Sequence, residues 1–286
     1  MSPDVLVDDD RGDTVEPCGI VDGGSSVFGE DSGVRGVPGH HEASTAKGHE
    51  TRDGSPGGNH GWRRLVTDQM SNAIKVDIWS DVQCPWCYVG KRKFEAGAQA
   101  FGGELDVEYH SFELSPDTPV DFDGTRVDYL MQHKGMSKDQ AEQGLAHMTD
   151  IARGVGLEFD YDHVHQTNTV ISHELIHFAK SKGRQLEMKE RLLEAYFVKG
   201  EHVGRIPDLV DIAVELGYDR DEVTEALETH RHLPDVKADV AQAAEYGIQG
   251  VPFFVIDGKY GVSGAQEAAT FTRVLTEVAG ERGSFR

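Results

Sequence analysis

The sequence predicts an α/β fold in which a small sheet is split into two halves by a large all-helical insertion. Apolar and polar residues alternate, as in strands, at residues 74–79 and 105–112, and strand signals return at 252–262. Between them, residues 126–245 follow a helical period instead. Two cysteines three positions apart directly follow the first strand, which places a reactive pair at the start of the next element.

Composition and periodicity divide the chain into four segments. Residues 1–72 are rich in Gly and Asp and poor in bulky apolar side chains, so we expect a disordered N-terminal extension. We expect residues 73–125 to form the first half of the sheet domain, 126–245 the helical insertion and 246–286 the second half. Met70 stands just before the patterned sequence, and we expect the functional protein to begin near it.

The first half of the sheet domain is predicted to consist of a strand, a helix, a second strand and a loop. Ile74–Trp79 alternates and predicts a buried strand. A helix is expected from around Tyr88 to about Phe101, where two glycines end it. Leu105–Phe112 alternates again and predicts a second strand, and the prolines and aspartates of Glu113–Asp123 predict a loop.

The insertion contains several segments with apolar residues at three- or four-residue steps, separated by glycine or polar breaks. The predicted helices are Val127–His133, Lys138–Val155, Thr169–Lys182, Gln185–Lys199, Ile206–Leu216 and Asp221–His230. Ser137 and Gln140 have the spacing of a capping box at the start of one of them.

Strand signals return at Pro252–Ile256, followed by an Asp257-Gly258 turn, a short strand at Lys259–Val262 and a final helix at Ala265–Gly280. The element order is strand, helix, strand, helical insertion, hairpin, helix. Together with the cysteine pair, it predicts a thioredoxin-like fold with a large all-helical insertion between the two halves of the sheet.

Cys84-Pro85-Trp86-Cys87 carries the clearest chemistry of the chain. On a first helical turn, both sulfurs face the same side, and the helix N-terminus stabilises a thiolate on Cys84. A low-pKa thiolate beside a second thiol performs thiol–disulfide exchange. We expect Pro85 and Trp86 to tune the pKa of Cys84 and to contact substrate.

Two interpretations of the cysteines and histidines as metal ligands are weaker than the redox interpretation of the cysteine pair. A structural zinc site needs further Cys or His at regular spacing, and the other cysteine, Cys18, lies far away in the extension. His173-Glu174-Leu175-Ile176-His177 matches the H-E-x-x-H pattern of zinc proteases, with Glu194 or Glu201 as further acids. Two histidines four apart on a helix are more often a packed face, so we expect no metal.

Val251-Pro252 stands immediately before the returning strand. A proline at this junction is a candidate for a cis peptide bond, although a trans proline at the start of an edge strand is the simpler alternative. In a thioredoxin-like fold, this loop faces the cysteine pair. We therefore favour the cis isomer and expect the Val251 backbone with Pro252 to hold a substrate segment in extended form.

Three blocks of the chain resemble cytosolic DsbA-like oxidoreductases of the FrnE type: residues 80–91 around the cysteines, residues 112–117, and residues 250–266. The resemblance implies a thioredoxin fold with a helical insertion, a nucleophilic Cys84, a resolving Cys87 and a cis-proline at Pro252. Kappa-class glutathione transferases and hydroxychromene-carboxylate isomerases are similar in architecture but carry Ser where Cys84 stands. They imply the alternative function, a glutathione-dependent transferase or isomerase.

The chain has a formal net charge of −22, and acidic residues exceed basic ones in both the extension and the remainder. This charge argues against nucleic acid or an anionic membrane surface as a partner. No secretory leader or membrane-spanning run is evident, so we expect a cytoplasmic protein. The predicted partners are a disulfide-containing protein or a low-molecular-weight thiol such as glutathione, with no cofactor; the sequence predicts no oligomeric state.

Overall fold

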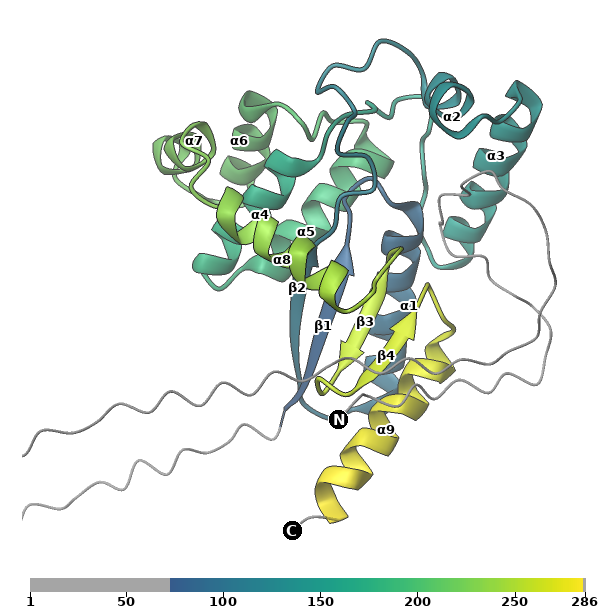
Figure 1. Ribbon diagram of the computed structural model, residues 1–286, viewed down its shortest axis with the longest axis vertical. Coiled ribbons are helices and arrows are strands. Elements are labelled where there is room, and N and C mark those ends of the chain that lie inside the picture. Colours follow the sequence, from purple (N-terminus) through teal and green to yellow (C-terminus); the bar gives the residue numbers. More distant parts are fainter. Residues whose placement is uncertain (1–72, 285–286) are drawn as a thin grey trace, which may run out of the picture.

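The computed structural model describes residues 73–284 (Figure 1). The predicted disorder of residues 1–72, Cys18 and the proposed start near Met70 all lie outside the described residues. Within them, the predicted fold class is confirmed: a mixed four-stranded sheet is interrupted, between its second and third strands, by a long series of helices.

The strands of the sheet are β1 (Ile74–Ser80), β2 (Leu105–Ser111), β3 (Phe253–Ile256) and β4 (Tyr260–Ser263), in the order β2-β1-β3-β4. β1 runs parallel to β2 and antiparallel to β3, so that Ile78 lies opposite Phe254. The C-terminal ends of β1 and β2 and the N-terminal end of β3 therefore meet at one edge of the sheet. The segment after β1, the insertion and the segment before β3 all begin or end there.

Two helices cover one face of the sheet. α1 (Pro85–Phe101) and α9 (Ala268–Ser284) lie side by side on it (Figure 1). The rings of Phe94, Phe254 and Phe271 join α1, β3 and α9, with centroids 4.7 to 5.5 Å apart. Phe254 and Phe271 are fully buried. Burial of these large aromatic side chains stabilises the layer.

The insertion forms helices close to the predicted ranges: α2 (Arg126–Lys134), α3 (Lys138–Gly154), α4 (Val170–Ser181), α5 (Gln185–Glu194), α6 (Ile206–Glu215), α7 (Arg220–Glu228) and α8 (Leu233–Glu245). The capping box is confirmed, because the Ser137 and Gln140 side chains each bond the other's backbone N–H. The predicted helical range Gln185–Lys199 is confirmed, and its last turn, Ala195–Lys199 (η1), is π-helical. α8, with Pro234 in its first turn, lies in the region expected to be helical but had no separate predicted range.

The insertion packs directly on the start of α1. Tyr88 and Val89 of α1 belong to the same apolar core as Leu175 of α4 and Leu192 of α5. The Tyr88 hydroxyl also donates a hydrogen bond to Glu190 Oε1 of α5, 2.8 Å away. The insertion therefore covers the first turns of α1. Among residues 73–284, no helix is long and apolar enough to cross a membrane.

Candidate active site

The cysteine pair occupies the first turn of α1. Cys84 is the N-cap residue, with an extended backbone (φ −87°, ψ 112°), and its carbonyl accepts a hydrogen bond from Cys87 N at 3.1 Å. The helix begins at Pro85, about one turn before the predicted start at Tyr88. Proline suits this position because it has no N–H to leave unsatisfied and its φ is preset for a helix. Both thiols are reduced in this structure.

The loop before β3 reaches the first cysteine. The Val251–Pro252 peptide bond is cis, the isomer predicted from the sequence. Cys84 Sγ donates a hydrogen bond to the Val251 carbonyl oxygen, 3.4 Å away. Cys84, Cys87 and Val251 share one apolar cluster, and the half-buried Trp86 packs against it. The structure thus brings together the predicted site residues of the two halves of the sheet domain.

Gly90, one turn into α1, allows the cis-proline loop to approach. A Cβ atom at Gly90 would lie 2.9 Å from Pro252 Cγ and 3.3 Å from Ala265 Cβ. The first of these distances is too short for a real contact, so any side chain forces the loop away from α1. The close neighbours of Gly90 are therefore the cis-proline loop and the segment that follows β4.

Replacing Gly90 with alanine is expected to destabilise the protein by about 1 to 3 kcal/mol, because the added methyl overpacks the contact with Pro252. Urea denaturation measures the change. Gly144→Ala in α3 is the matched control, since its Cβ would meet only Met136 Cε at 3.8 Å. That variant should gain about 0.5 to 1 kcal/mol from helix propensity alone. Equal effects of the two substitutions would contradict the packing argument.

Both sulfurs are covered in this structure. The exposed fraction is 0% for Cys84 and 2% for Cys87. Phe112 and Leu114, from the segment after β2, and Tyr246, after α8, pack against the cluster that contains them. Any molecule that reaches Cys84 must therefore displace part of this apolar cover.

A buried carboxylate supports the loop that carries the cysteines. Asp81 is fully buried, and its carboxylate accepts hydrogen bonds from Leu114 N and Thr169 Oγ1, each at 2.8 Å. Burial opposes its ionisation, but the imidazole of His173, 3.4 Å away, and the hydrogen bonds hold the pKa of Asp81 below its usual value. The Asp81 carbonyl accepts from Cys84 N at 3.3 Å, so this network fixes the backbone position of Cys84.

The H-E-x-x-H residues of α4 have separate protein partners. His173 faces Asp81, while His177 Nε2 lies 2.9 Å from Asp239 Oδ2. Glu174 is buried and pairs with His230 Nδ1 at 2.8 Å. The two histidines therefore do not converge on one point. This arrangement fits the interpretation of the motif as a packed helix face.

A second buried network, missed by the sequence reasoning, joins the sheet to α8. His110 of β2 lies between two carboxylates, with Nδ1 2.9 Å from Asp239 and Nε2 2.8 Å from Asp77 of β1. Burial lowers the pKa of His110, but the two carboxylates outweigh it and raise the pKa to about 9. Burial raises the pKa of Asp239, but its hydrogen bonds with His110, His177 and Ser111 N outweigh burial and hold this pKa far below its usual value.

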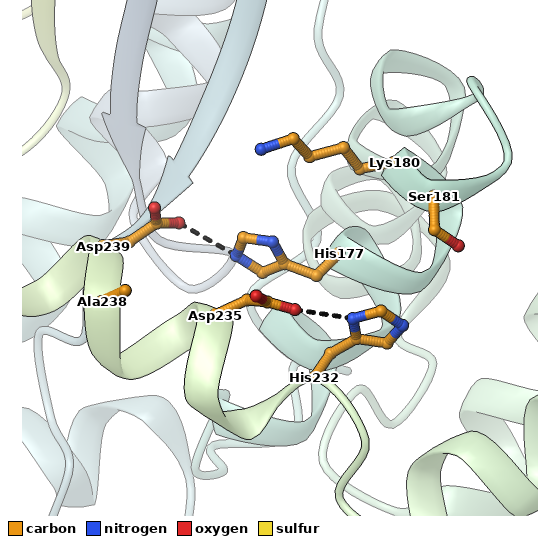
Figure 2. A pocket seen from close by; sticks show the side chains of 7 residues that line it. All are labelled: His177, Lys180, Ser181, His232, Asp235, Ala238 and Asp239. Carbon is orange, nitrogen blue, oxygen red and sulfur yellow. Dashed lines mark hydrogen bonds and ion pairs between the residues drawn. The ribbon is translucent and has the colours of Figure 1, made fainter. Parts of the chain in front are cut away.

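This network borders a pocket of about 390 Å³ between α4 and α8. Figure 2 shows His177 of α4 and Asp239 of α8 facing each other, with His232 paired to Asp235 beside them. Asp77, Glu108 and His110 have ligand atoms within 4.8 Å of one another. Glu108 already pairs with Lys180, and His110 with Asp239, so protein partners occupy these groups.

Lys189 of α5 was also missed. Its side chain is fully buried, and its Nζ reaches the carbonyl of Ser80, the last residue of β1, at 3.4 Å. Burial lowers its pKa to about 8, although Cys87, Asp81 and Cys84 act in the opposite direction. One signal was available: Lys189 falls on the apolar stripe of α5, between Met188 and Leu192, which are both fully buried.

The fold and the cysteine pair facing a cis-proline define a redox-type thioredoxin-fold domain. Residues 75–276 match the model of the DSBA-like thioredoxin domain, and the chain belongs to that family.

Three known proteins are similar to the chain. A crystal structure of a probable DsbA oxidoreductase, SCO1869 from Streptomyces coelicolor, is 38% identical with a TM-score of 0.68, covering 73% of this chain and 91% of that one. The uncharacterized protein YwbO of Bacillus subtilis is 29% identical, over 71% of this chain and 96% of its own length. A 2-hydroxychromene-2-carboxylate isomerase structure (TM-score 0.56, 16% identical, covering 74% and 99%) is similar in fold alone.

Proposed function

We propose that this chain is a thiol–disulfide oxidoreductase of the FrnE type that acts in the cytoplasm through Cys84 and Cys87. One observation carries the proposal: the first cysteine of the pair lies 3.4 Å from the carbonyl that precedes the cis-proline. The nucleophile thus stands beside the backbone against which an extended substrate can pair. Membership of the DSBA-like family supports the same class of reaction.

The chemistry follows from the positions of the two thiols. The Cys84 thiolate, stabilised by the N-terminus of α1, attacks a substrate disulfide and forms a mixed disulfide, releasing the first substrate sulfur as a thiolate. Cys87 then attacks Cys84 Sγ, which closes the enzyme disulfide and releases the second substrate sulfur. In the oxidising direction the steps reverse.

Ionisation of Cys84 is coupled to substrate docking in this arrangement. The thiol donates a hydrogen bond to the Val251 carbonyl, and a thiolate has no S–H to donate. Once Cys84 ionises, the Val251 carbonyl becomes available to accept a backbone N–H of an extended substrate. Pro252 cannot donate to a neighbouring strand, which leaves this position to the incoming chain.

The apolar side chains that cover the two cysteines limit the kind of substrate that can reach them. Trp86, Phe112 and Leu114 surround the sulfurs, which have almost no exposed surface. A small disulfide or a flexible peptide segment fits such a site better than a rigid protein surface. We propose as partners a low-molecular-weight thiol such as glutathione or a flexible disulfide-containing protein.

Insulin reduction tests the proposal. The full-length protein should reduce insulin with dithiothreitol as electron donor, and Cys84→Ser should reduce it no faster than buffer. Cys87→Ala should lose at least about tenfold in turnover and accumulate a mixed disulfide, because the second step is blocked. Cys18→Ser is the control and should keep the wild-type rate. Full activity in Cys84→Ser would overturn the proposal.

The same variants test the alternative function. A glutathione-dependent transferase or isomerase needs only one sulfur to anchor the tripeptide, so its activity should persist in Cys87→Ala. Thiol exchange should collapse in that variant. Transferase or isomerase turnover that survives in Cys87→Ala, with no insulin reduction by the wild type, would favour the alternative.

A further inference from the structure

One of the segments that cover the cysteines has no regular secondary structure. It runs from Phe112 to Thr118, between the end of β2 and the start of α2 (Figure 1), and we call it the strap. Phe112 and Leu114 of the strap pack against the apolar cluster that contains Cys84 and Cys87. Because both sulfurs are almost fully covered, the strap is part of the barrier that any reagent meets.

The other side chains that cover the sulfurs belong to elements that are held more firmly. Trp86 lies on α1 and Phe253 on β3, which pairs with a strand on each side. Tyr246 follows α8, and its ring packs edge-on against Trp79, with centroids 5.5 Å apart. Trp79 is a buried residue of β1, and its Nε1 donates to the Asp239 carbonyl at 3.1 Å. Moving the strap leaves these helices and strands intact, so it is the least costly part of the cover to open.

Two hydrogen bonds tie the backbone of the strap to other segments within residues 73–284. Leu114 N donates to Asp81 Oδ2 at 2.8 Å, and the Pro116 carbonyl accepts from Asn168 Nδ2 at 2.7 Å. The first bond ends on a fully buried carboxylate. The second joins an exposed proline to a half-buried asparagine, where water can replace the bond when it breaks.

Asn168 links the strap to the first turn of α4. Its Oδ1 accepts a hydrogen bond from Val170 N at 2.9 Å, while its Nδ2 holds the Pro116 carbonyl. The next residue, Thr169, donates through Oγ1 to Asp81 Oδ1 at 2.8 Å. The start of α4 therefore supports both points at which the backbone of the strap is attached.

We propose that the strap is a gate over the cysteine pair and that Asn168 is its latch. The proposal rests on the thiol-exchange function proposed above and concerns how a substrate disulfide reaches Cys84. Opening breaks the hydrogen bonds at Pro116 and Leu114 and withdraws the Leu114 side chain from the sulfurs. The closed strap shields the thiols, and the open strap admits a substrate. The bond from Asn168 to Pro116 sets how often the strap opens.

Replacing Asn168 with aspartate isolates the latch. Aspartate keeps the oxygen that accepts from Val170 N, and a carboxylate is favourable at a helix N-terminus, so α4 is preserved. Aspartate has no N–H to donate and directs negative charge at the Pro116 carbonyl, so the strap should open more often. In the full-length protein, the rate of Cys84 alkylation by iodoacetamide should rise at least about fivefold, the effect of one lost hydrogen bond. Mass spectrometry of the peptide that contains Cys84 measures this rate.

Two further results separate gating from a change in the thiol itself. The alkylation rate should rise by the same factor at every pH, with no shift in the midpoint of its pH profile, because Asn168 bonds to the strap and α4. The amide hydrogen of Leu114, which the open strap releases from Asp81, should exchange with solvent faster by a similar factor. Gln140→Glu adds the same charge at an exposed position of α3 and keeps its capping box, so it should match the wild type in both measurements.

Wild-type rates of alkylation and of Leu114 exchange in Asn168→Asp would overturn the inference, and so would an equal acceleration in Gln140→Glu. If Asn168→Asp does not fold, Tyr129→Phe replaces it. This variant removes the bond between the Ser115 and Tyr129 hydroxyls, which joins the strap to α2, and should accelerate both reactions as well.

The wild type also tests the gate without any variant. Alkylation of Cys84 and exchange of the Leu114 amide should rise with the same slope in sub-denaturing urea, because one opening exposes both groups. Alkylation that is independent of urea while Leu114 exchange accelerates would refute the gate. These measurements do not depend on turnover. A strap that opens as expected in a protein that never reduces insulin would therefore refute the exchange function alone.

Discussion

Replacing Asp239 with asparagine is expected to lower the free energy of unfolding by about 3 to 5 kcal/mol near pH 6, the usual loss when one partner of a buried ion pair is removed. Asp239 accepts from Ser111 N at 2.7 Å and pairs with both His110 and His177. Asparagine keeps the shape but removes the charge that faces both imidazoles. Because α8 leads directly to the loop of Val251 and Pro252, loosening this contact should also lower the exchange rate.

The pH dependence of this effect follows from the shifted pKa values. His110 has its pKa raised from 6.5 to about 9, so its contribution to stability is complete below pH 6.5 and is lost as the pH rises through 9. Asp239 has its pKa lowered from 3.8, so its contribution is complete above pH 3.8 and is lost as the pH falls through its lower folded-state pKa. The pair therefore contributes fully between about pH 4 and 6.5. At pH 10, the loss in Asp239→Asn should shrink to about 1 kcal/mol, the value of ordinary hydrogen bonds.

Asp235→Asn is the matched control. It lies one turn earlier on α8 and binds His232 Nδ1 at 2.8 Å, but its side chain is 54% exposed, against 10% for Asp239. Exposed pairs contribute only about 0 to 1 kcal/mol, so this variant should change little. Urea denaturation at pH 6 and pH 10 measures the free energy of unfolding of both variants. Equal losses of stability in the two variants, or a loss in Asp239→Asn that is the same at both pH values, would contradict a stabilising role for the buried ion pairs of Asp239.

Lys189→Met should have the opposite effect and raise the free energy of unfolding by about 3 kcal/mol at pH 7, since each unit of pKa shift corresponds to about 1.4 kcal/mol. Folding lowers the pKa of Lys189 from 10.5 to about 8, so the folded protein disfavours the ammonium. The penalty is complete below pH 8 and disappears as the pH rises to 10.5, where both states are neutral. The gain from Lys189→Met should thus fade between pH 8 and 10.5.

Denaturation at pH 7 and pH 10.5 measures this gain, with exposed Lys237→Met as a control that should stay within about 0.5 kcal/mol of wild type. Destabilisation by Lys189→Met at pH 7 would show instead that the lysine has a structural role.

Local patterns in the sequence were sufficient to predict most of the helices and strands of the fold. The alternation in Ile74–Trp79 and Leu105–Phe112 and the helical period of the insertion are set by neighbouring residues, and the observed elements differ from the predicted ones mainly at their ends. The start of α1 was misplaced by one turn because proline was not used as a first-turn residue. The π-helical segment η1 carries the fully buried Tyr196 and Phe197, and the local period of apolar residues does not distinguish it from an α-helical turn.

The sequence by itself determined the two chemical centres, because each is encoded in contiguous residues: Cys84-Pro85-Trp86-Cys87 on one side and Val251-Pro252 on the other. Only the tertiary structure decided what lies around them. Lys189 and Asp239 both sit on apolar stripes of helices, where a long or charged side chain either extends to solvent or stays buried. The distant partners that contact each side chain settle that choice: Ser80 of β1 and Tyr109 of β2 for Lys189, and His110 with His177 for Asp239.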